Sequence, residues 1–388
     1  MQKNIPLSQD ILSLWWWYID ETYNPWIIAD LVNKAISERG YEVLQYNDCL
    51  WLPELRKYWK QFLEEKFWIQ DIGDDEIMIT NWATAWIDLA SRHILEQWKY
   101  NSIALSPIYD TALESLKRNS KDLFSIPLNL FDENCKNIID WQKIEEAMQD
   151  ENTKLFYVNP NFQNPTGIVL DQETKERLYE LAEQYWVIIL EDDPYKLYNF
   201  SESKLWENII NMDKKKDNVI YLNSISKVFY PWLRIGFLVW NSKVIEWISE
   251  LQKYSTSSPN LIMQWAVIEA FKAWEIEKSL AHYIKEIWEK SNIIISVLEK
   301  NWLLKKDSPI EFTNSKWGFY LWGRFKDGRS TDELSKQALQ YWVSFVSWSI
   351  YGKEPEYNDS FRIAYAQINK EKIVEAIVRF NRLVKNTI

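Results

Sequence analysis

The sequence predicts an α/β fold, with a large domain built on a mostly parallel mixed sheet flanked by helices and a smaller α+β domain. Between about residues 75 and 240, short β-rich runs alternate with segments whose apolar residues follow helical spacing. This alternation is typical of a parallel sheet covered by helices on both faces. The chain has 388 residues, more than one hydrophobic core usually holds, so we expect two domains and a cleft between them.

Six short runs are the expected strands of the large domain: residues 77–80, 102–105, 155–158, 187–190, 219–222 and 237–239. Helical segments such as residues 172–184 lie between them. In open α/β sheets, ligands bind beyond the carboxyl ends of the strands. The residues that follow each run are therefore the candidates for a functional site.

The last part of the chain is typical of the smaller domain. A long amphipathic segment at residues 278–300 precedes β-rich runs at 319–322, 343–346 and 361–365, and a closing helix is expected from about Lys370. We expect the large domain to span residues 46–277 and the small C-terminal domain residues 278–388. Residues 1–45 are expected to form an N-terminal segment that belongs to the small domain.

Composition and charge disfavour several kinds of protein. The net charge of −11 and a pI near 5.0 argue against nucleic-acid and anionic-membrane partners, which select for clustered Lys and Arg. Cys49 and Cys135 are far apart and belong to no Cys/His cluster, so we expect neither disulfides nor a metal site. The sequence has no export signal and no apolar run of about 18 residues, which predicts a soluble, cytoplasmic protein.

Glycine is scarce in this chain and tryptophan is abundant. The chain has 8 Gly and 24 Trp, whereas a usual Gly content of roughly 7% would give about 27. A Trp-rich core is one explanation, but an indole cannot serve a tight turn that needs Gly. We hypothesise that many of these codons are UGA, read as Gly by the source organism and translated here as Trp. We expect UGA at Trp82, Trp232 and Trp317, at most or all of Trp15, Trp16 and Trp17, and at Trp342 and Trp348, but UGG at Trp322.

Residues whose side chains can bind a ligand or take part in catalysis follow four of the expected strands. Asn81 to Thr84 open a helix whose free N–H groups can hold a phosphate, and Asn164 lies in a turn that can direct an amide into the cleft. The strand at 187–190 is followed by Asp192, Asp193 and Tyr195, and the strand at 219–222 by Ser224, Ser226, Lys227 and Arg234. Each residue alone has an ordinary explanation as a turn or a surface charge. Together they are expected along one edge of the sheet, which indicates an active site.

Four runs of residues carry a resemblance to a known family: NFQNPTG at 161–167, EDDPY at 191–195, SKVFYPWLRIG at 226–236 and FRIAY at 361–365. Over nearly its whole length the chain resembles the class I/II aminotransferases, which are fold-type I enzymes dependent on pyridoxal 5'-phosphate (PLP). It is most similar to the branch of 2-aminoadipate and kynurenine aminotransferases and of the enzyme-like domains of some bacterial regulators. It departs from the family where Trp stands in place of Gly.

The resemblance implies a role for each residue around the cofactor ring. Lys227 would carry PLP as a Schiff base and move the proton between the substrate and the cofactor. Asp192 would pair with the pyridinium nitrogen and keep the ring an electron sink, with Asp193 as the rival candidate. Asn164 and Tyr195 would hydrogen-bond the ring hydroxyl. Tyr109 would stack on the ring, with core packing as its alternative.

The resemblance also implies the phosphate site and the assembly. The phosphate would be held by the backbone N–H groups of Ala83 and Thr84 together with Ser224, Ser226 and Arg234. Tyr46 of a second subunit would reach the same phosphate, so a homodimer with shared active sites is expected.

Arg362 bears on the reaction, because a guanidinium grips a carboxylate with two parallel hydrogen bonds. By the resemblance it would hold the substrate α-carboxylate, with a surface salt bridge as the alternative, and so favour proton loss over decarboxylation. Asn164 and Trp17 complete the expected substrate contacts. The bordering segment 18–25 has aromatic and acidic residues but no Arg, so we expect aromatic or aliphatic amino acids as donors, with glutamate and 2-oxoglutarate as the partner pair.

We therefore expect an aminotransferase that moves an amino group between an L-amino acid and a 2-oxo acid. A β- or γ-lyase on the same fold would share Lys227, Asp192 and Arg362, and a PLP-binding protein without catalysis is a second alternative. A PLP-sensing regulator would need a DNA-binding domain. Only about 45 residues precede Tyr46, and they are not basic.

Overall fold

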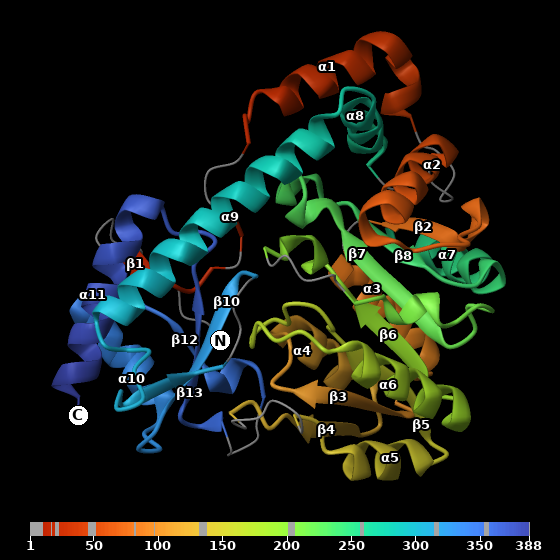
Figure 1. Ribbon diagram of the computed structural model, residues 1–388. Helices are drawn as coiled ribbons and strands as arrows, with labels where there is room; N and C mark the ends of the chain where they lie inside the picture. Colours follow the sequence, from red (N-terminus) through yellow and green to blue (C-terminus); the bar gives the residue numbers. More distant parts are fainter. Residues whose placement is uncertain are drawn as a thin grey trace.

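The computed structural model describes residues 11–16, 18–19, 23–45, 52–80, 83–96, 98–131, 138–200, 206–256, 260–313, 318–352 and 357–387. A large sheet and a smaller antiparallel sheet, each with its own helices, form the two main parts of the molecule (Figure 1).

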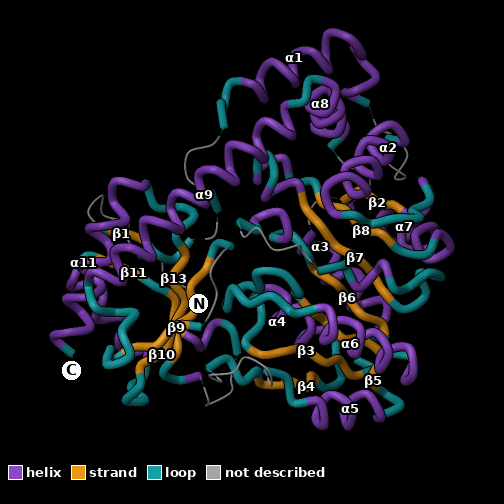
Figure 2. Tube along the Cα trace, viewed as in Figure 1, coloured by secondary structure: helices purple, strands orange, loops and turns teal. Residues whose placement is uncertain are grey.

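The large sheet has seven strands in the order β2-β8-β7-β6-β5-β3-β4 (Figure 2). Their bounds are β2 Ile77–Thr80, β3 Asn101–Ser106, β4 Leu123–Pro127, β5 Thr153–Val158, β6 Ile188–Asp192, β7 Val219–Ser224 and β8 Gly236–Val239. Neighbouring strands are parallel except that β8 runs antiparallel to β2 and β7. The six predicted strands and the mostly parallel mixed sheet are confirmed, and β4 is an additional strand.

Helices cover both faces of this sheet because alternate strand residues point to opposite sides. Ile77 and Ile79 belong to one apolar cluster and Met78 to another. On the Met78 face lie α3 Ala83–Ile94, α4 Asp110–Asn119 and α7 Ser242–Thr256. On the other face lie α2 Pro53–Phe62, α5 Trp141–Gln149, α6 Gln172–Tyr185 and α8 Leu261–Lys272.

The smaller part is built on a four-stranded antiparallel sheet in the order β12-β13-β10-β9. Its strands are β9 Ile310–Phe312, β10 Tyr320–Phe325, β12 Val346–Ser347 and β13 Ser360–Ala364, and its helices are α10 Thr331–Gln337 and α11 Lys370–Asn386. The run expected at 343–346 is divided, because β11 Val343–Ser344 pairs with β1 Leu12–Ser13 in a separate sheet. The N-terminal strand thus joins the smaller part.

Helix α9 Glu275–Lys300 connects the two parts (Figure 1). Ile276 near its start is buried in the core of the large part, whereas Leu298 near its end is buried in the core of the smaller part. Helix α1 Ile27–Arg39 packs against α8 and contributes Leu31 to the large core. The domain boundaries at residues 46 and 278 stay a prediction.

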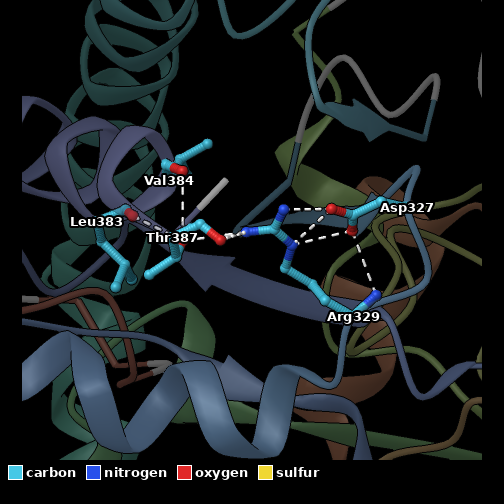
Figure 3. A network of polar contacts seen from close by, with 5 residues as sticks. All are labelled: Asp327, Arg329, Leu383, Val384 and Thr387. Atoms are coloured by element: carbon cyan, nitrogen blue, oxygen red, sulfur yellow. Dashed lines mark hydrogen bonds and ion pairs between the residues drawn. The ribbon is translucent and has the colours of Figure 1, made fainter.

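Short helices connect the main elements. Their bounds are η1 Gly40–Leu44, η2 Leu63–Phe67, η3 Asp74–Glu76, η4 Lys196–Tyr198, η5 Ile209–Asn211, η6 Ile225–Lys227, η7 Pro231–Leu233, η8 Ala338–Tyr341 and η9 Trp348–Ile350. The C-terminal end of α11 is held by Arg329, whose guanidinium donates to the Thr387 carbonyl oxygen at 2.6 Å while it pairs with Asp327 (Figure 3). A cation in this place complements the partial negative charge at the end of a helix.

Tryptophan occupies an unusual backbone conformation in this fold. Eleven non-glycine residues of the described part have positive φ, and six of them are Trp, with φ from 57° to 75°: Trp68, Trp98, Trp186, Trp274, Trp302 and Trp342. Such angles favour glycine, since a Cβ there is strained. The hypothesis that Gly is the native residue at many Trp positions therefore gains a steric basis.

The steric basis does not extend to every position named from the sequence. Trp342 has positive φ, but Trp15, Trp16, Trp232 and Trp348 do not. In the loop around Trp232 the left-handed conformation is taken by Arg234, with φ of 56°, so positive φ gives no reason for Gly at position 232. Trp17, Trp82 and Trp317 lie outside the described residues, and recoding stays a prediction.

Candidate active site

Lys227 ends η6, directly after β7, and its side chain is buried. Its Nζ lies 5.5 Å from the ring centroid of Tyr195 and 5.3 Å from that of Phe319. Burial and the charge of Arg362 together lower the pKa of Lys227 to about 7, although the charge of Asp192 acts in the opposite direction. A substantial part of this amine is therefore neutral near pH 7, and only the neutral form has a lone pair for nucleophilic attack or proton abstraction.

Asp192 is the last residue of β6 and is buried. Its Oδ2 accepts a hydrogen bond of 2.6 Å from the hydroxyl of Tyr157, on the adjacent strand β5. Burial raises the pKa of Asp192 to about 7, whereas the Tyr157 hydrogen bond and the charge of Lys227 act in the opposite direction. Tyr157 was not among the sequence candidates. The available signal was a hydroxyl in the otherwise apolar run at residues 155–158, two residues before Asn159.

Asp193 belongs to a different group of buried residues. Its carboxylate accepts hydrogen bonds from Asn161 at 2.8 Å and from Asn208 at 2.6 Å. The charges of Lys196 and Lys175 lower its pKa, although burial raises it overall. Consecutive residues at the end of a strand point to opposite faces, so Asp192 meets Tyr157 and the Lys227 charge while Asp193 meets this amide and lysine network.

Arg362 lies in β13 and is only 1% exposed. Its guanidinium donates to Asn164 Oδ1 at 2.8 Å and to the backbone oxygen of Trp15. The rings of Tyr320 and Tyr351 have their centroids 4.8 and 5.2 Å from its Cζ. Because Asn164 follows β5 in the large part, this hydrogen bond brings a cation of the smaller part to the edge of the large sheet.

An anion site can form where three strands meet. Thr80 and Ser224 each pair with Gly236, on the two sides of β8, so the end of β2, the end of β7 and the start of β8 lie in one row. Helix α3 begins at Ala83, soon after Thr80, and its first N–H groups have no partner within the helix. Arg234 precedes Gly236 by two residues. Backbone amides, hydroxyls and a guanidinium at such a place can hold a phosphate.

The hydroxyls beside this row are hydrogen-bonded to each other. Ser224 Oγ donates to Ser226 Oγ at 2.9 Å and accepts from the Ser226 N–H at 3.1 Å. Burial lowers the pKa of Arg234 to about 10, and the field of Tyr109 acts to raise it. Tyr109, which precedes α4, also contributes to the raised pKa of Tyr195, so it lies near both groups.

The remaining candidates divide into two sets. Ala83 and Thr84 begin α3, and their backbone is described. Tyr46 and Trp17 lie outside the described residues.

Within the described ranges, no group of three or more His, Cys, Asp or Glu side chains is arranged to hold a metal ion. No helix of the described chain is long and apolar enough to cross a membrane.

Comparison with known proteins identifies the family of the chain. The family model "Aminotransferase class I and II" matches residues 22–380. Aromatic-amino-acid aminotransferase 1 of Thermococcus litoralis is 24% identical, over 94% of this chain and 85% of its own length. The chain has the fold of two solved structures, the kynurenine aminotransferase of Pyrococcus horikoshii, at a TM-score of 0.87, and the α-aminoadipate aminotransferase of Thermus thermophilus, at 0.83.

The two solved structures are 24% and 22% identical to this chain. The match to the first structure covers 98% of this chain and 92% of the matched chain, and the match to the second covers 97% of this chain and 93% of the matched chain. The second is complexed with N-(5'-phosphopyridoxyl)-L-leucine. With the family model matching nearly the whole length, the chain belongs to the class I and II aminotransferases, the fold-type I enzymes that use PLP to move an amino group between an amino acid and a 2-oxo acid.

Proposed function

We propose that this enzyme carries out transamination at the site formed by Lys227, Asp192, Tyr195, Asn164 and Arg362. The observation that carries the proposal is the set of charges around Lys227. A buried amine with its pKa lowered to about 7 lies in the field of one carboxylate and one guanidinium. These groups are a nucleophile, a partner for a protonated ring nitrogen and a receptor for a substrate carboxylate.

The residues also fit PLP by the chemistry of their donors. A primary amine suits the aldehyde, a buried carboxylate suits the ring nitrogen, and the anion site beside Ser224 and Arg234 suits the phosphate. When bound, PLP supplies an electron sink for the charge left at the substrate α-carbon. Lys227 Nζ would take the α-proton as the neutral amine and give it back from the resulting ammonium group. Tyr195 and Asn164 would hold the ring hydroxyl by hydrogen bonds, and Tyr109 would stack on the ring.

Arg362 orients the substrate. In this structure the guanidinium donates to Asn164 Oδ1 and to the Trp15 backbone oxygen. Two parallel hydrogen bonds to the substrate α-carboxylate would replace these contacts. By the resemblance, Asn164 and Trp17 would also contact the substrate. A carboxylate that is held firmly directs the Cα–H bond toward Lys227, so a proton is lost while the carboxylate stays on the substrate.

Aromatic or aliphatic amino acids are the proposed donors, and 2-oxoglutarate the proposed acceptor. Tyr320 and Tyr351 support this choice, because their buried rings make an aromatic wall around the guanidinium. A panel of amino donors with 2-oxoglutarate tests it, with glutamate, ammonia and thiol measured as products. Ammonia or thiol release without glutamate would overturn transamination in favour of the lyase reaction.

We also propose a homodimer with shared active sites and a cytoplasmic location. The dimer is supported by the family, and the location by the two widely spaced cysteines, a usage typical of reducing compartments.

Arg362→Lys should raise the KM for amino acids by roughly 10- to 100-fold, because one ammonium replaces a two-pronged hydrogen-bonded contact worth about 1.5–3 kcal/mol. Cofactor affinity should stay near that of the unchanged protein. Steady-state kinetics with fluorescence titration of PLP separates the two effects. Tyr351→Phe is a control that keeps the guanidinium, and an unchanged KM in Arg362→Lys would make Arg362 structural.

Asp192→Asn should mainly reduce activity, whereas Asp193→Asn should mainly reduce stability. Asp192→Asn removes the charge that would keep the ring nitrogen protonated, so activity should fall about 10²-fold or more while PLP stays bound. Asp193→Asn leaves Lys175 and Lys196 with one buried counter-charge fewer, so its main effect should be a lower melting temperature. Turnover rates and thermal melts of both holoenzymes make the comparison, and the reverse order would exchange the two roles.

A further inference from the structure

Tyr320 is a buried phenol at the start of β10, and its hydroxyl oxygen lies 2.7 Å from that of Tyr195. The two rings are nearly perpendicular, with centroids 5.6 Å apart. Tyr195 follows β6 of the large sheet, 125 residues away in sequence. The contact therefore joins the two parts of the molecule beside Lys227.

Each of the two hydroxyls has one proton to donate. A phenol donates one hydrogen bond and can accept another. Burial raises the pKa of both Tyr195 and Tyr320, so both phenols stay protonated at neutral pH. If Tyr195 uses its one proton toward the cofactor ring oxygen, its own oxygen can only accept, and Tyr320 is the donor at 2.7 Å.

We propose that Tyr320 is a positioning residue, which donates its hydroxyl proton to Tyr195 and so directs the proton of Tyr195 toward the ring oxygen of PLP. This inference rests on the proposed function of the site. Consecutive hydrogen bonds polarise one another, so a phenol that accepts a bond becomes a better donor. Tyr320 thus strengthens the hydrogen bond to the cofactor without touching the cofactor itself.

The consequence is a measurable property of the holoenzyme. A hydrogen bond donated to the ring oxygen stabilises the negative charge of that oxygen, most strongly in the deprotonated form of the bound cofactor. This hydrogen bond would therefore lower the pH at which the visible absorption of the bound cofactor titrates. Loss of the Tyr320 hydroxyl weakens that hydrogen bond. The titration midpoint should therefore move to higher pH.

The test is a spectral pH titration of the holoenzyme with three single variants. Tyr320→Phe keeps the ring against Arg362 and should move the midpoint up by about half a pH unit, a part of the net strength of one hydrogen bond. Tyr195→Phe should move it further in the same direction. Tyr351→Phe is the matched control, because Tyr351 also lies beside Arg362. It should leave the midpoint unchanged, because no hydrogen bond joins Tyr351 to Tyr195 within the described residues.

A double variant distinguishes this role from a structural one. In Tyr195→Phe/Tyr320→Phe the midpoint should equal that of Tyr195→Phe alone, because Tyr320 acts only through Tyr195. Additive shifts, or an unmoved midpoint in Tyr320→Phe beside a moved one in Tyr195→Phe, would overturn the inference and leave the site assignment intact. An unmoved midpoint in Tyr195→Phe would overturn both.

Discussion

Lys227→Ala should lower the rate of transamination by roughly 10⁴-fold or more, because it removes both the nucleophile and the proton carrier. Lys227 Nζ is buried beside Tyr195 and Phe319, and its pKa of about 7 suits proton transfer at neutral pH. Single-turnover kinetics with an amino donor measures the loss, and the visible spectrum reports the cofactor. A variant that retains nearly the original rate would contradict the assignment of Lys227.

Two further measurements make the result specific for the amine. Lys227→Arg is the matched control, since it keeps a positive charge but cannot form the covalent link or release its proton near neutral pH. It should be as inactive as Lys227→Ala. A small primary amine such as methylamine in the buffer should restore part of the activity of Lys227→Ala, which a variant that has merely unfolded would not show.

The six Trp→Gly changes at positive φ should each stabilise the protein by about 1 kcal/mol, the strain of a side chain in the left-handed region. Several of these residues end helices with the hydrogen bonds of a glycine-terminated motif. After α6, Val187 N–H donates to Ala182 at 2.9 Å, and after α9, Leu303 N–H donates to Leu298 at 2.9 Å. Trp186 and Trp302 have the left-handed conformation directly before Val187 and Leu303, and their side chains are 77% and 50% exposed.

Exposed indoles contribute little packing, so their removal should cost little. Thermal or urea unfolding of single and combined variants measures the gain, which should add over these separate sites. Trp→Ala at the same positions is the matched control, because alanine loses the indole but keeps the strained Cβ. Equal gains for Ala and Gly would show that strain is not the cause.

Trp322→Gly supplies the opposite control. Trp322 is fully buried in β10 and contacts Tyr351 and Tyr357 edge to face. Its loss should destabilise the protein by about 3–5 kcal/mol, as for other large buried side chains. The codons give an independent answer. UGA at the six positive-φ positions and UGG at Trp322 are expected, and UGG throughout would contradict recoding.

The sequence by itself determined six of the seven strands of the large sheet, all but β4, and the chemical groups at their ends. Strand residues alternate or run apolar over four to six positions, and such patterns are local. Lys227, Asp192 and Tyr195 could be named because each lies at the end of a strand or within three residues after it, and parallel strands end at one edge. The composition also led to the hypothesis that Gly is the native residue at many Trp positions, since a Gly deficit can be seen without knowledge of the fold.

Only the tertiary structure decided which of these groups meet. Tyr157 and Asp192 are 35 residues apart, Tyr195 and Tyr320 are 125 apart, and Asn164 and Arg362 are 198 apart. Such pairs depend on how sheets and helices pack, which no local pattern encodes. The same is true of the opposite directions of Asp192 and Asp193, and of the Trp residues with positive φ, because a backbone angle is set by the hydrogen bonds and packing of the elements that it joins.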